Sequence, residues 1–343
     1  MISGVPRVWG IPFLRCLHDA MGNAIIDKYE MLGVYGMITT ICMNPSFDKT
    51  VEVDALTLGE VNRIRTTRTD MGGKGINVAV VLRRLGMDCR CVGVMGEGGS
   101  DLLRDMLDAE GIAGDFLTVP GNVRVNTKIV SRESRKVTEL NEPGAPMDEG
   151  QLQAFIALVK EKVAGRDYVV LTGSLPPGCP EGTYRRLMQA MEDTNCILDA
   201  GGKELELGAE ARPFLIKPNL GELQASLGLE LRTLRAIRDA ALIYLRKGVK
   251  HVVVSMGSMG AMYVGQDKTL FAPALRVEAG STVGAGDAMV GGLLRGLEAE
   301  GDMTRAFRYG VAAGAASVMT EGTQLIMPED FSCLLGQVKV QEV

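Results

Sequence analysis

The chain has 343 residues, of which 46% are hydrophobic and 23% are charged, and its formal net charge is −5. This composition excludes a disordered chain, and an acidic balance without a basic cluster argues against a nucleic-acid partner. No apolar run is long enough to cross a bilayer, so we expect no membrane partner. Seven cysteines at irregular spacing predict free thiols, and therefore a cytoplasmic protein.

Residues 1–36 differ from the rest of the chain because their apolar residues follow no regular period. The apolar stretch at residues 8–17 has no small-residue cleavage site after it, which argues against a signal peptide. We therefore expect residues 1–36 to be a poorly ordered extension and residues 37–340 to form the folded domain.

From Met37 onward, short apolar runs alternate with longer amphipathic runs. The apolar runs predict strands at Ile38–Cys42, Arg90–Val94, Tyr168–Thr172, Cys196–Asp199, Phe214–Lys217, Val252–Ser255 and Ala261–Val264. The amphipathic runs predict helices at Ile76–Leu85, Asp101–Glu110, Gln151–Val163, Thr183–Met191, Gly221–Leu227, Leu234–Lys247 and Ala288–Glu300. This alternation predicts an α/β fold with a mostly parallel central sheet and helices on both of its faces.

Two stretches, Lys49–Asp70 and Asn122–Leu140, have no helical period and alternate between polar and apolar residues. Both are typical of antiparallel strands with one exposed face. We expect these stretches, at about 49–70 and 122–141, to pair into a small sheet that closes over a substrate as a lid. Two unrelated edge hairpins are the alternative, because strand pairing cannot be deduced from the pattern alone.

Polar, glycine-rich stretches follow or lie between the predicted elements. They are Asn44–Asp48, Gly72–Asn77, Gly173–Gly178, Lys217–Glu222 and Ser255–Gly260. Ligands bind beyond the carboxyl ends of strands in open α/β sheets, so these stretches predict one large polar cleft. Neither a Walker A loop nor an early dinucleotide-binding fingerprint is present, which argues against an NAD-dependent oxidoreductase.

One further motif immediately precedes the helix predicted at Ala288–Glu300. Gly284, Ala285 and Gly286 let the backbone approach a ligand, and the free N–H groups of a helix start attract an anion. Asp287 places a carboxylate beside this site. The chain has two histidines, neither in a triad-like setting, so Asp287 is the candidate general base and a helix cap is the alternative. The helix dipole should favour its ionised form and make it a weak base.

Two motifs resemble the two signatures of the PfkB (ribokinase-like) sugar kinases. They are Gly72-Gly73-Lys74-Gly75-Ile76-Asn77-Val78-Ala79 and Ser281-Thr282-Val283-Gly284-Ala285-Gly286-Asp287-Ala288. The resemblance extends from Met37 to about Leu335. It implies a ribokinase-like three-layer sandwich with a small β lid. Further stretches are similar to the branch that phosphorylates sugar phosphates: Asn44–Thr50, Arg124–Asn126, Thr138–Gly144, Gly173–Gly178 and Lys217–Asn219.

This resemblance implies an ATP- and Mg²⁺-dependent kinase that acts on a ketohexose phosphate. We expect conversion of fructose 1-phosphate into fructose 1,6-bisphosphate, and tagatose 6-phosphate is the alternative substrate because no single residue decides between them. Asp287 would act as the base, and Gly284–Gly286 would form the anion hole for the phosphoryl group in transit. Many family members dimerise through the lid, so a homodimer is expected.

The sugar phosphate is expected to contact residues of the lid and of the glycine-rich stretches. These residues are Asp48, Gly72, Gly73, Lys74, Asn77, Arg124, Asn126 and Ser174. Lys74 and Arg124 are the candidates for the phosphate already on the sugar, with Lys128 and Arg63 as weaker alternatives. For Asn77, a helix cap is the alternative role.

The ATP site is expected to be lined by Lys217, Asn219, Ser255, Gly257 and Gly260. Asn219 and Glu222 resemble the family's Asn-x-x-Glu element and would organise Mg²⁺, through water, because this ion keeps much of its hydration shell. A capping box is the alternative for this pair, with Asn219 at the N-cap and Glu222 at N3, and the two roles are compatible.

Overall fold

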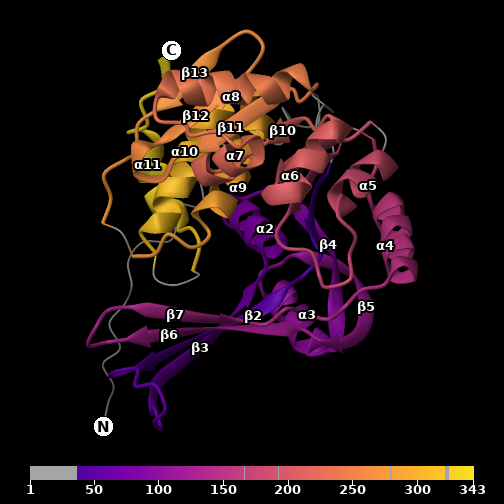
Figure 1. Cartoon of the computed structure of the whole chain (residues 1–343), viewed down its shortest axis with the longest axis vertical. Helices are drawn as coiled ribbons and strands as arrows, with labels where there is room; N and C mark the ends of the chain where they lie inside the picture. The colour runs from indigo at the N-terminus through magenta and orange to yellow at the C-terminus, as the bar shows by residue number, and fades with distance from the viewer. Residues whose placement is uncertain (1–36, 166, 192, 279, 321–323) are drawn as a thin grey trace, which may run out of the picture. The chain divides into compact units, whose positions relative to one another are not determined.

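A computed structural model describes residues 37–343 except 166, 192, 279 and 321–323. The extension predicted at residues 1–36 lies outside the described residues. Within the described range, the strands form a ten-stranded central sheet and a separate four-stranded sheet (Figure 1). All six cysteines of this range are free thiols, as predicted.

The central sheet is mostly parallel, as the alternation of strands and helices predicted. Its order is β14 (Gln341–Glu342), β13 (Thr269–Ala272), β12 (Ala261–Val264), β11 (His251–Ser255), β10 (Leu215–Ile216), β9 (Asn195–Asp199), β8 (Tyr168–Thr172), β1 (Ile38–Cys42), β4 (Cys89–Gly98) and β5 (Ala113–Asn122). The strands from β11 to β5 pair in parallel, and the other three pairs are antiparallel. The carboxyl ends of the parallel strands therefore meet at one edge of the sheet.

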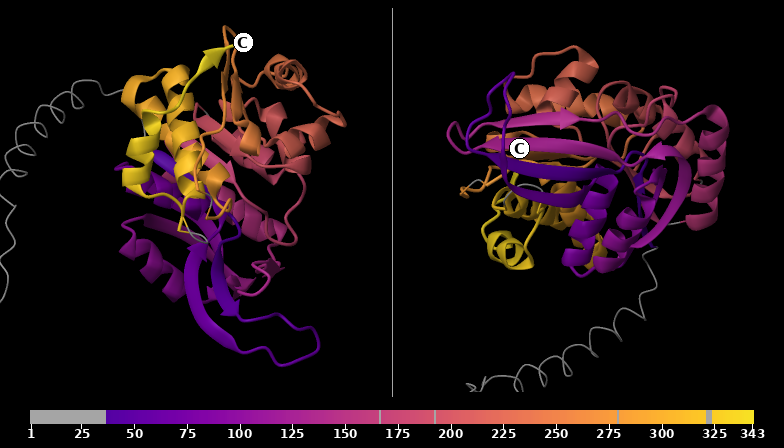
Figure 2. Two further views of the ribbon diagram at one scale, coloured as in Figure 1. Left: turned by 90° about the vertical axis from the view of Figure 1, so that its left-hand side faces the viewer. Right: turned by 90° about the horizontal axis from the view of Figure 1, so that it is seen from below.

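Helices cover both faces of the central sheet, which confirms the predicted three-layer sandwich (Figure 2). One layer contains α2 (Lys74–Arg84), α3 (Ser100–Ala109), α9 (Ala285–Glu300), α10 (Met303–Val318) and α11 (Pro328–Leu335). The other contains α4 (Glu149–Lys162), α5 (Thr183–Ala190), α6 (Gly202–Gly208), α7 (Leu220–Leu227) and α8 (Leu234–Arg246). No helix in the described range has the length and apolarity needed to cross a membrane.

The smaller sheet has the order β3 (Ile64–Gly72), β2 (Ser46–Val53), β6 (Arg124–Ser131) and β7 (Val137–Asn141). The two stretches predicted to pair do so, and are not unrelated hairpins. One detail of the prediction is wrong, because β2 and β6 pair in parallel while β2–β3 and β6–β7 are antiparallel. The reason is that β2 follows β1 and β6 follows β5, and these two strands of the central sheet run in the same direction.

Glycines on α9 let this helix lie close to both of its neighbours in the layer. A Cβ atom added to Gly296 would lie 2.6 Å from the Cα atom of Ala306 in α10. One added to Gly291 would lie 2.4 Å from a methyl carbon of Val81 in α2. Because α9 carries the candidate base Asp287, these contacts hold that carboxylate close to α2.

We predict that Gly296→Ala lowers the free energy of unfolding, although alanine is the better helix former by about 1 kcal/mol. The new methyl group meets α10 backbone, which cannot rotate away, and such overpacking costs about 1–3 kcal/mol. Urea unfolding measures the difference. Gly336→Ala is the matched control, because its methyl group would meet nothing closer than 4.0 Å. A Gly296→Ala variant as stable as the Gly336→Ala control would contradict the close packing of α9.

Candidate active site

The glycine motif before α9 forms a helix start that is open to a ligand. Gly284 is the N-cap and adopts the left-handed conformation, with φ of 80°, and no side chain caps the free N–H groups that follow it. A Cβ atom at Gly286 would lie 3.3 Å from Lys217 Nζ, so the ammonium group stands beside the first turn of α9. Backbone N–H groups, the helix dipole and this ammonium together favour an anion here.

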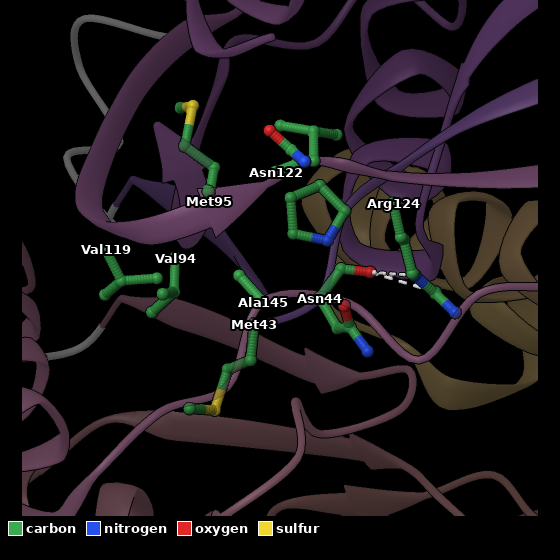
Figure 3. Close-up of a pocket in the computed structure, with 11 residues that line it drawn as sticks. Met43, Asn44, Val94, Met95, Val119, Asn122, Arg124 and Ala145 are labelled. Atoms are coloured by element: carbon green, nitrogen blue, oxygen red, sulfur yellow. Dashed lines mark hydrogen bonds between the residues drawn. The ribbon is translucent and has the colours of Figure 1, made fainter. Parts of the chain in front are cut away.

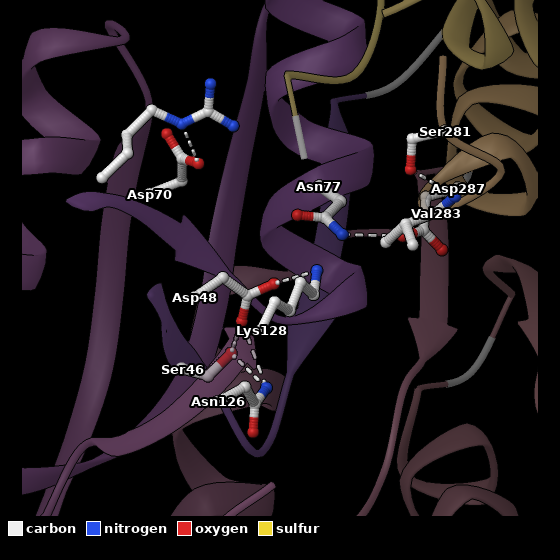
Figure 4. A network of polar contacts seen from close by, with 10 residues as sticks. Ser46, Asp48, Asp70, Asn77, Asn126, Lys128, Ser281, Val283 and Asp287 are labelled. Atoms are coloured by element: carbon white, nitrogen blue, oxygen red, sulfur yellow. Dashed lines mark hydrogen bonds and ion pairs between the residues drawn. The ribbon is translucent and has the colours of Figure 1, made fainter. Parts of the chain in front are cut away.

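Asp287 lies in the first turn of α9 and is 4% exposed. Its Oδ2 atom accepts a hydrogen bond of 2.8 Å from Asn77 Nδ2 in α2 (Figure 4). Neither residue caps its helix, because the N-caps are Gly284 and Gly73, so the capping alternatives are wrong for both. The structure thus joins the two glycine motifs, 210 positions apart in sequence, through one hydrogen bond.

The pKa of Asp287 is raised to about 6. Burial is the main cause, since it disfavours the charged carboxylate, and the negative charge of Asp199 adds to it. Lys74, the hydrogen bond from Asn77 and Lys217 act in the opposite direction. The expectation that the helix dipole makes Asp287 a weak base is therefore wrong, because burial outweighs the groups that favour its ionised form.

Asp199, which sequence reasoning missed as a site residue, ends β9 in the middle of this cluster. Its Oδ1 atom lies 3.0 Å from Lys217 Nζ, and both side chains are almost fully buried. Burial opposes ionisation of Asp199, but the cations Lys217 and Lys74 outweigh it and lower the pKa. A single carboxylate at the end of the apolar run Cys196–Asp199 was the available signal, since ligands gather at the carboxyl ends of parallel strands.

Lys74 is the first residue of α2 and is exposed toward solvent. The charge of Asp199 raises the pKa of Lys74 most. Partial loss of hydration among the neighbouring groups of the site acts against it, and the charges of Asp287 and Glu222 raise it further. The lysine therefore stays protonated beside three carboxylates. Such a cation suits a phosphate group.

A second polar cluster lies on the smaller sheet, around Asp48 in β2 (Figure 4). Its Oδ1 atom accepts hydrogen bonds from Ser46 Oγ at 2.8 Å and from Asn126 Nδ2 at 3.1 Å. Lys128 Nζ lies 3.3 Å from Oδ2. A Cβ atom at Gly72 would lie 2.5 Å from Oδ1, so only glycine fits against this carboxylate. The predicted Asp48, Asn126 and Gly72 are thus brought together, with Ser46 as an unpredicted partner.

Arg124 and Ser174 both form a hydrogen bond with Asn44, the first polar residue after β1, and Figure 3 shows the contact of Arg124. The guanidinium of Arg124 donates from Nε and Nη2 to the carbonyl oxygen of Asn44, at 3.2 and 2.9 Å. Asn44 Nδ2 in turn donates to Ser174 Oγ at 3.4 Å and to the carbonyl oxygen of Pro143 at 3.0 Å. The structure therefore holds Arg124 on the protein backbone, and burial lowers the pKa of this guanidinium.

Asn44 and Arg124 also line a cavity of ≈ 10 Å³, shown in Figure 3. This volume is enough for about one water molecule and too small for a sugar. Neither Asp287 nor Asp48 lines it. We therefore place the candidate site at the charged clusters and not at this cavity.

The predicted nucleotide-binding residues lie at the end of β11 and on the loops after β10 and β11. Asn219 and Ser255 are joined by an isolated parallel bridge, and the turn Gly257–Met259 follows. Gly260 closes this turn with φ of 102°, and a Cβ atom there would lie 2.0 Å from a backbone oxygen. Of the predicted nucleotide-binding residues, Lys217 after β10 is the one that the structure places beside Gly286.

Asn219 and Glu222 form the capping box of α7, as the alternative interpretation predicted. Asn219 Oδ1 accepts from the Glu222 N–H, and Glu222 Oε2 accepts from the Asn219 N–H, both at 2.8 Å. No group of three or more His, Cys, Asp or Glu side chains within the described residues could hold a metal ion. Mg²⁺ bound with phosphates needs only one or two carboxylates, so Glu222 fits this ion as one ligand among waters.

Comparison with known proteins identifies the family to which this chain belongs. The chain is 36% identical to the 1-phosphofructokinase of Rhodobacter capsulatus over 307 residues, which cover 89% of this chain and 97% of the relative. Its fold matches phosphofructokinase-2 from Escherichia coli in complex with fructose-6-phosphate, with a TM-score of 0.82, 27% identity and coverage of 88% and 98%. Ribokinase from Thermotoga maritima matches with a TM-score of 0.73, 25% identity and coverage of 88% and 99%.

The family comparison covers most of the folded chain. Residues 42–330, which contain both glycine motifs, match the pfkB family carbohydrate kinases. The ribokinase match confirms the ribokinase-like sandwich expected from the sequence. On this evidence, and with the two signature motifs joined by the hydrogen bond between Asn77 and Asp287, the chain belongs to the pfkB family of carbohydrate kinases.

Proposed function

We propose that this protein transfers the γ-phosphoryl group of ATP to fructose 1-phosphate and forms fructose 1,6-bisphosphate. The observation that carries the proposal is the buried carboxylate of Asp287 directly beside the open helix start at Gly284–Gly286. A base and an anion site in contact are what transfer of a phosphoryl group to an alcohol requires.

Asp287 would accept the proton of the attacking sugar hydroxyl as the new oxygen–phosphorus bond forms. Asn77 donates to Oδ2 and fixes the carboxylate, which leaves Oδ1 for the hydroxyl. The N–H groups of Gly284–Gly286 and the ammonium of Lys217 would stabilise the charge on the transferred group. Their positions are set by the fold before substrate binds, so little reorganisation is needed during the reaction.

The sugar phosphate would lie between the two polar clusters, against Asp48, Asn126, Gly72 and Gly73. Lys74 is exposed and protonated, so it is the first candidate for the phosphate that the sugar already carries. Arg124 is the second. Its Nε and Nη2 groups hold the carbonyl oxygen of Asn44, which leaves Nη1 for a phosphate oxygen, and Ser174 would contact the sugar from the other side of Asn44.

ATP would bind along the loops of Lys217, Asn219, Ser255, Gly257 and Gly260. When bound, Mg²⁺ neutralises charge on the phosphate oxygens of the nucleotide. Glu222 would hold this ion through water, because its carboxylate already accepts the N–H of Asn219. The ATP-dependent reaction, with a phosphorylated sugar as acceptor, also agrees with the expected cytoplasmic location.

The choice of fructose 1-phosphate rests on relatives. Proteins from Rhodobacter capsulatus and Bacillus subtilis with the name 1-phosphofructokinase match this chain over 89% of its length. The names of these relatives favour fructose 1-phosphate over tagatose 6-phosphate as the substrate of this chain. The solved structure of the Escherichia coli enzyme with fructose-6-phosphate makes that sugar the comparison substrate of most interest.

ADP release in a coupled assay tests the proposal, with fructose 1-phosphate, tagatose 6-phosphate, fructose 6-phosphate, fructose and ribose as parallel substrates. We expect the highest kcat/KM with fructose 1-phosphate, no turnover in EDTA, and recovery when Mg²⁺ is added.

Asp287→Asn should lose turnover by about 10²-fold or more with little change in sugar binding, because it removes only the base. Highest kcat/KM on an unphosphorylated sugar, or a nearly normal kcat for Asp287→Asn, would overturn the proposal.

The pH dependence of kcat/KM provides a second test. Asp287 must be ionised to accept a proton, and its pKa is raised to about 6. The rate should therefore fall by about tenfold for each pH unit below 6. Asp199→Asn removes a charge that raises the pKa of Asp287, so it should move this acidic limb to lower pH. Asp105→Asn, an exposed change on α3, is the control and should leave the limb in place.

We also propose that two copies of this chain associate through the smaller sheet. Its edges and the loop between β2 and β3 expose several large apolar side chains. They are Leu58, Val61, Ile64, Val137 and Leu140. Monomeric proteins rarely gather such side chains on one projecting element, and a second copy would remove them from water.

Light scattering after size-exclusion chromatography measures this association. The wild type should have the mass of a dimer, and Leu140→Asp should shift it toward the monomer because it introduces a charge into the contact. Leu102→Asp makes the same change on α3, at a residue that is 53% exposed, and should remain dimeric. A monomeric wild type would contradict the proposal.

A further inference from the structure

The hydrogen bonds around Asp48 leave this carboxylate one clear way to bind a ligand. An ionised carboxylate has about four lone-pair positions. Two donors, Ser46 Oγ and Asn126 Nδ2, reach Oδ1, while one donor, Lys128 Nζ, reaches Oδ2. Oδ2 therefore holds the free acceptor position, and the ammonium nitrogen of Lys128 is the one donor that contacts Oδ2 among the residues described.

Lys128 is unusual for a lysine on a projecting sheet because its side chain is only 9% exposed, and that of Asp48 only 11%. Lysine is almost never buried without a partner of opposite charge. Asp48 is the one acceptor recorded for its ammonium group within the described residues. The burial of this lysine is thus tied to a single carboxylate.

The neighbouring polar groups are consistent with a face that meets a ligand. Thr50 pairs with Lys128 in register, and Asp48 pairs with Asn126, so their side chains lie on one face of the parallel pair β2–β6. Thr50 Oγ1 and Asn126 Oδ1 are buried and lack a hydrogen-bond partner among the residues described. Buried polar atoms are normally satisfied, so two unsatisfied ones beside a carboxylate with one free acceptor position indicate a cluster that a polar molecule completes.

We propose that Lys128 is a positioning residue that acts on the sugar through Asp48. Its ammonium holds Oδ2 in place, so that Oδ2 accepts a hydrogen bond from a hydroxyl of the acceptor sugar at a fixed angle. This inference rests on the proposed kinase function and extends it to a residue outside both signature motifs. Direct binding of the substrate phosphate by Lys128 is the competing role. It is disfavoured because Lys128 is already paired and buried, whereas Lys74 is exposed.

A double-mutant cycle separates these roles. Its variants are Lys128→Met, Asp48→Asn and the double variant, with Lys128→Arg to keep the charge and Lys136→Met as the control. Lys136 lies just before β7 and is exposed, so its replacement removes an ammonium from the same sheet without touching Asp48. Steady-state kcat and KM are measured for fructose 1-phosphate and for ATP, and thermal unfolding is recorded for each variant.

If Lys128 positions Asp48, Lys128→Met should lower kcat/KM for the sugar phosphate by about 100-fold, because small errors in substrate alignment have effects of this size. KM for ATP should change by less than about twofold, and Lys128→Arg should recover most of the loss. In the Asp48→Asn background, Lys128→Met should have little further effect, because the two residues act as one unit. Lys136→Met should behave as the wild type.

Three results would overturn the proposal. Equal losses from Lys128→Met in both backgrounds would show direct contact with the substrate. Equal increases in the KM for ATP and for the sugar phosphate would indicate a purely structural role. Normal kinetics of Lys128→Met would exclude any role in binding.

Folding and the proposed function are controlled separately. Lys128→Met leaves a buried carboxylate without its counter-charge and should melt earlier than the wild type, whereas the double variant should recover. If Lys128→Met does not fold, the comparison of Asp48→Asn with the double variant decides, since equal kinetics support the proposal and a further loss overturns it. A wild type that phosphorylates none of the sugars would mean that the kinase proposal has failed, before Lys128 is tested.

Discussion

The site depends on an ion pair that has been taken almost completely out of water. Lys217 and Asp199 face each other at 3.0 Å with nearly fully buried side chains. A pair of this kind gains little stability, because loss of hydration offsets most of its attraction. The effect of this ion pair is instead to fix the positions of two charged groups in the site. Asp199 holds the ammonium of Lys217 beside Gly286 in the anion site, and the same carboxylate helps to raise the pKa of Asp287 to about 6. One buried residue thus acts on both the proposed base and the proposed anion hole.

Much of the fold could be predicted because local pattern and burial agree. The valines of β11 form a continuous apolar run, as a strand covered on both faces requires, and all three are buried. Prediction failed where composition conceals the period. β5 contains Gly114, Pro120 and Gly121, which are poor strand formers, and α10 is rich in glycine and alanine with a weak contrast between its faces. Both elements are formed by tertiary packing, which no short window of sequence contains.

The candidate site could likewise be predicted in part. The start of α9 was predictable because Gly284 and Asp287 are local in sequence, and their geometry follows from where the helix begins. Asp199 was missed as a site residue because its role arises from Lys217 and Lys74 on other elements. Ser46 was missed although its partner Asp48 lies two positions away on β2, where the alternation of side chains along a strand places both on one face. Arg124 was identified from its charge, but its attachment to the carbonyl oxygen of Asn44, 80 positions away, follows only from the fold. The roles assigned to the sugar- and nucleotide-binding residues are proposals on a geometry that brings them to one edge of the sheet.

The parallel pairing of β2 and β6 has a mechanical consequence. Both strands are attached to the central sheet by short links, residues 43–45 after β1 and Val123 after β5, and β3 is joined to α2 by Gly73 alone. These are three of the four connections of the smaller sheet, and each is only one to three residues long, so the position of this sheet is closely tied to the central sheet and to α2. Because β3 continues into α2 through Gly73 alone, where the smaller sheet lies also fixes where Lys74, the first residue of α2, begins.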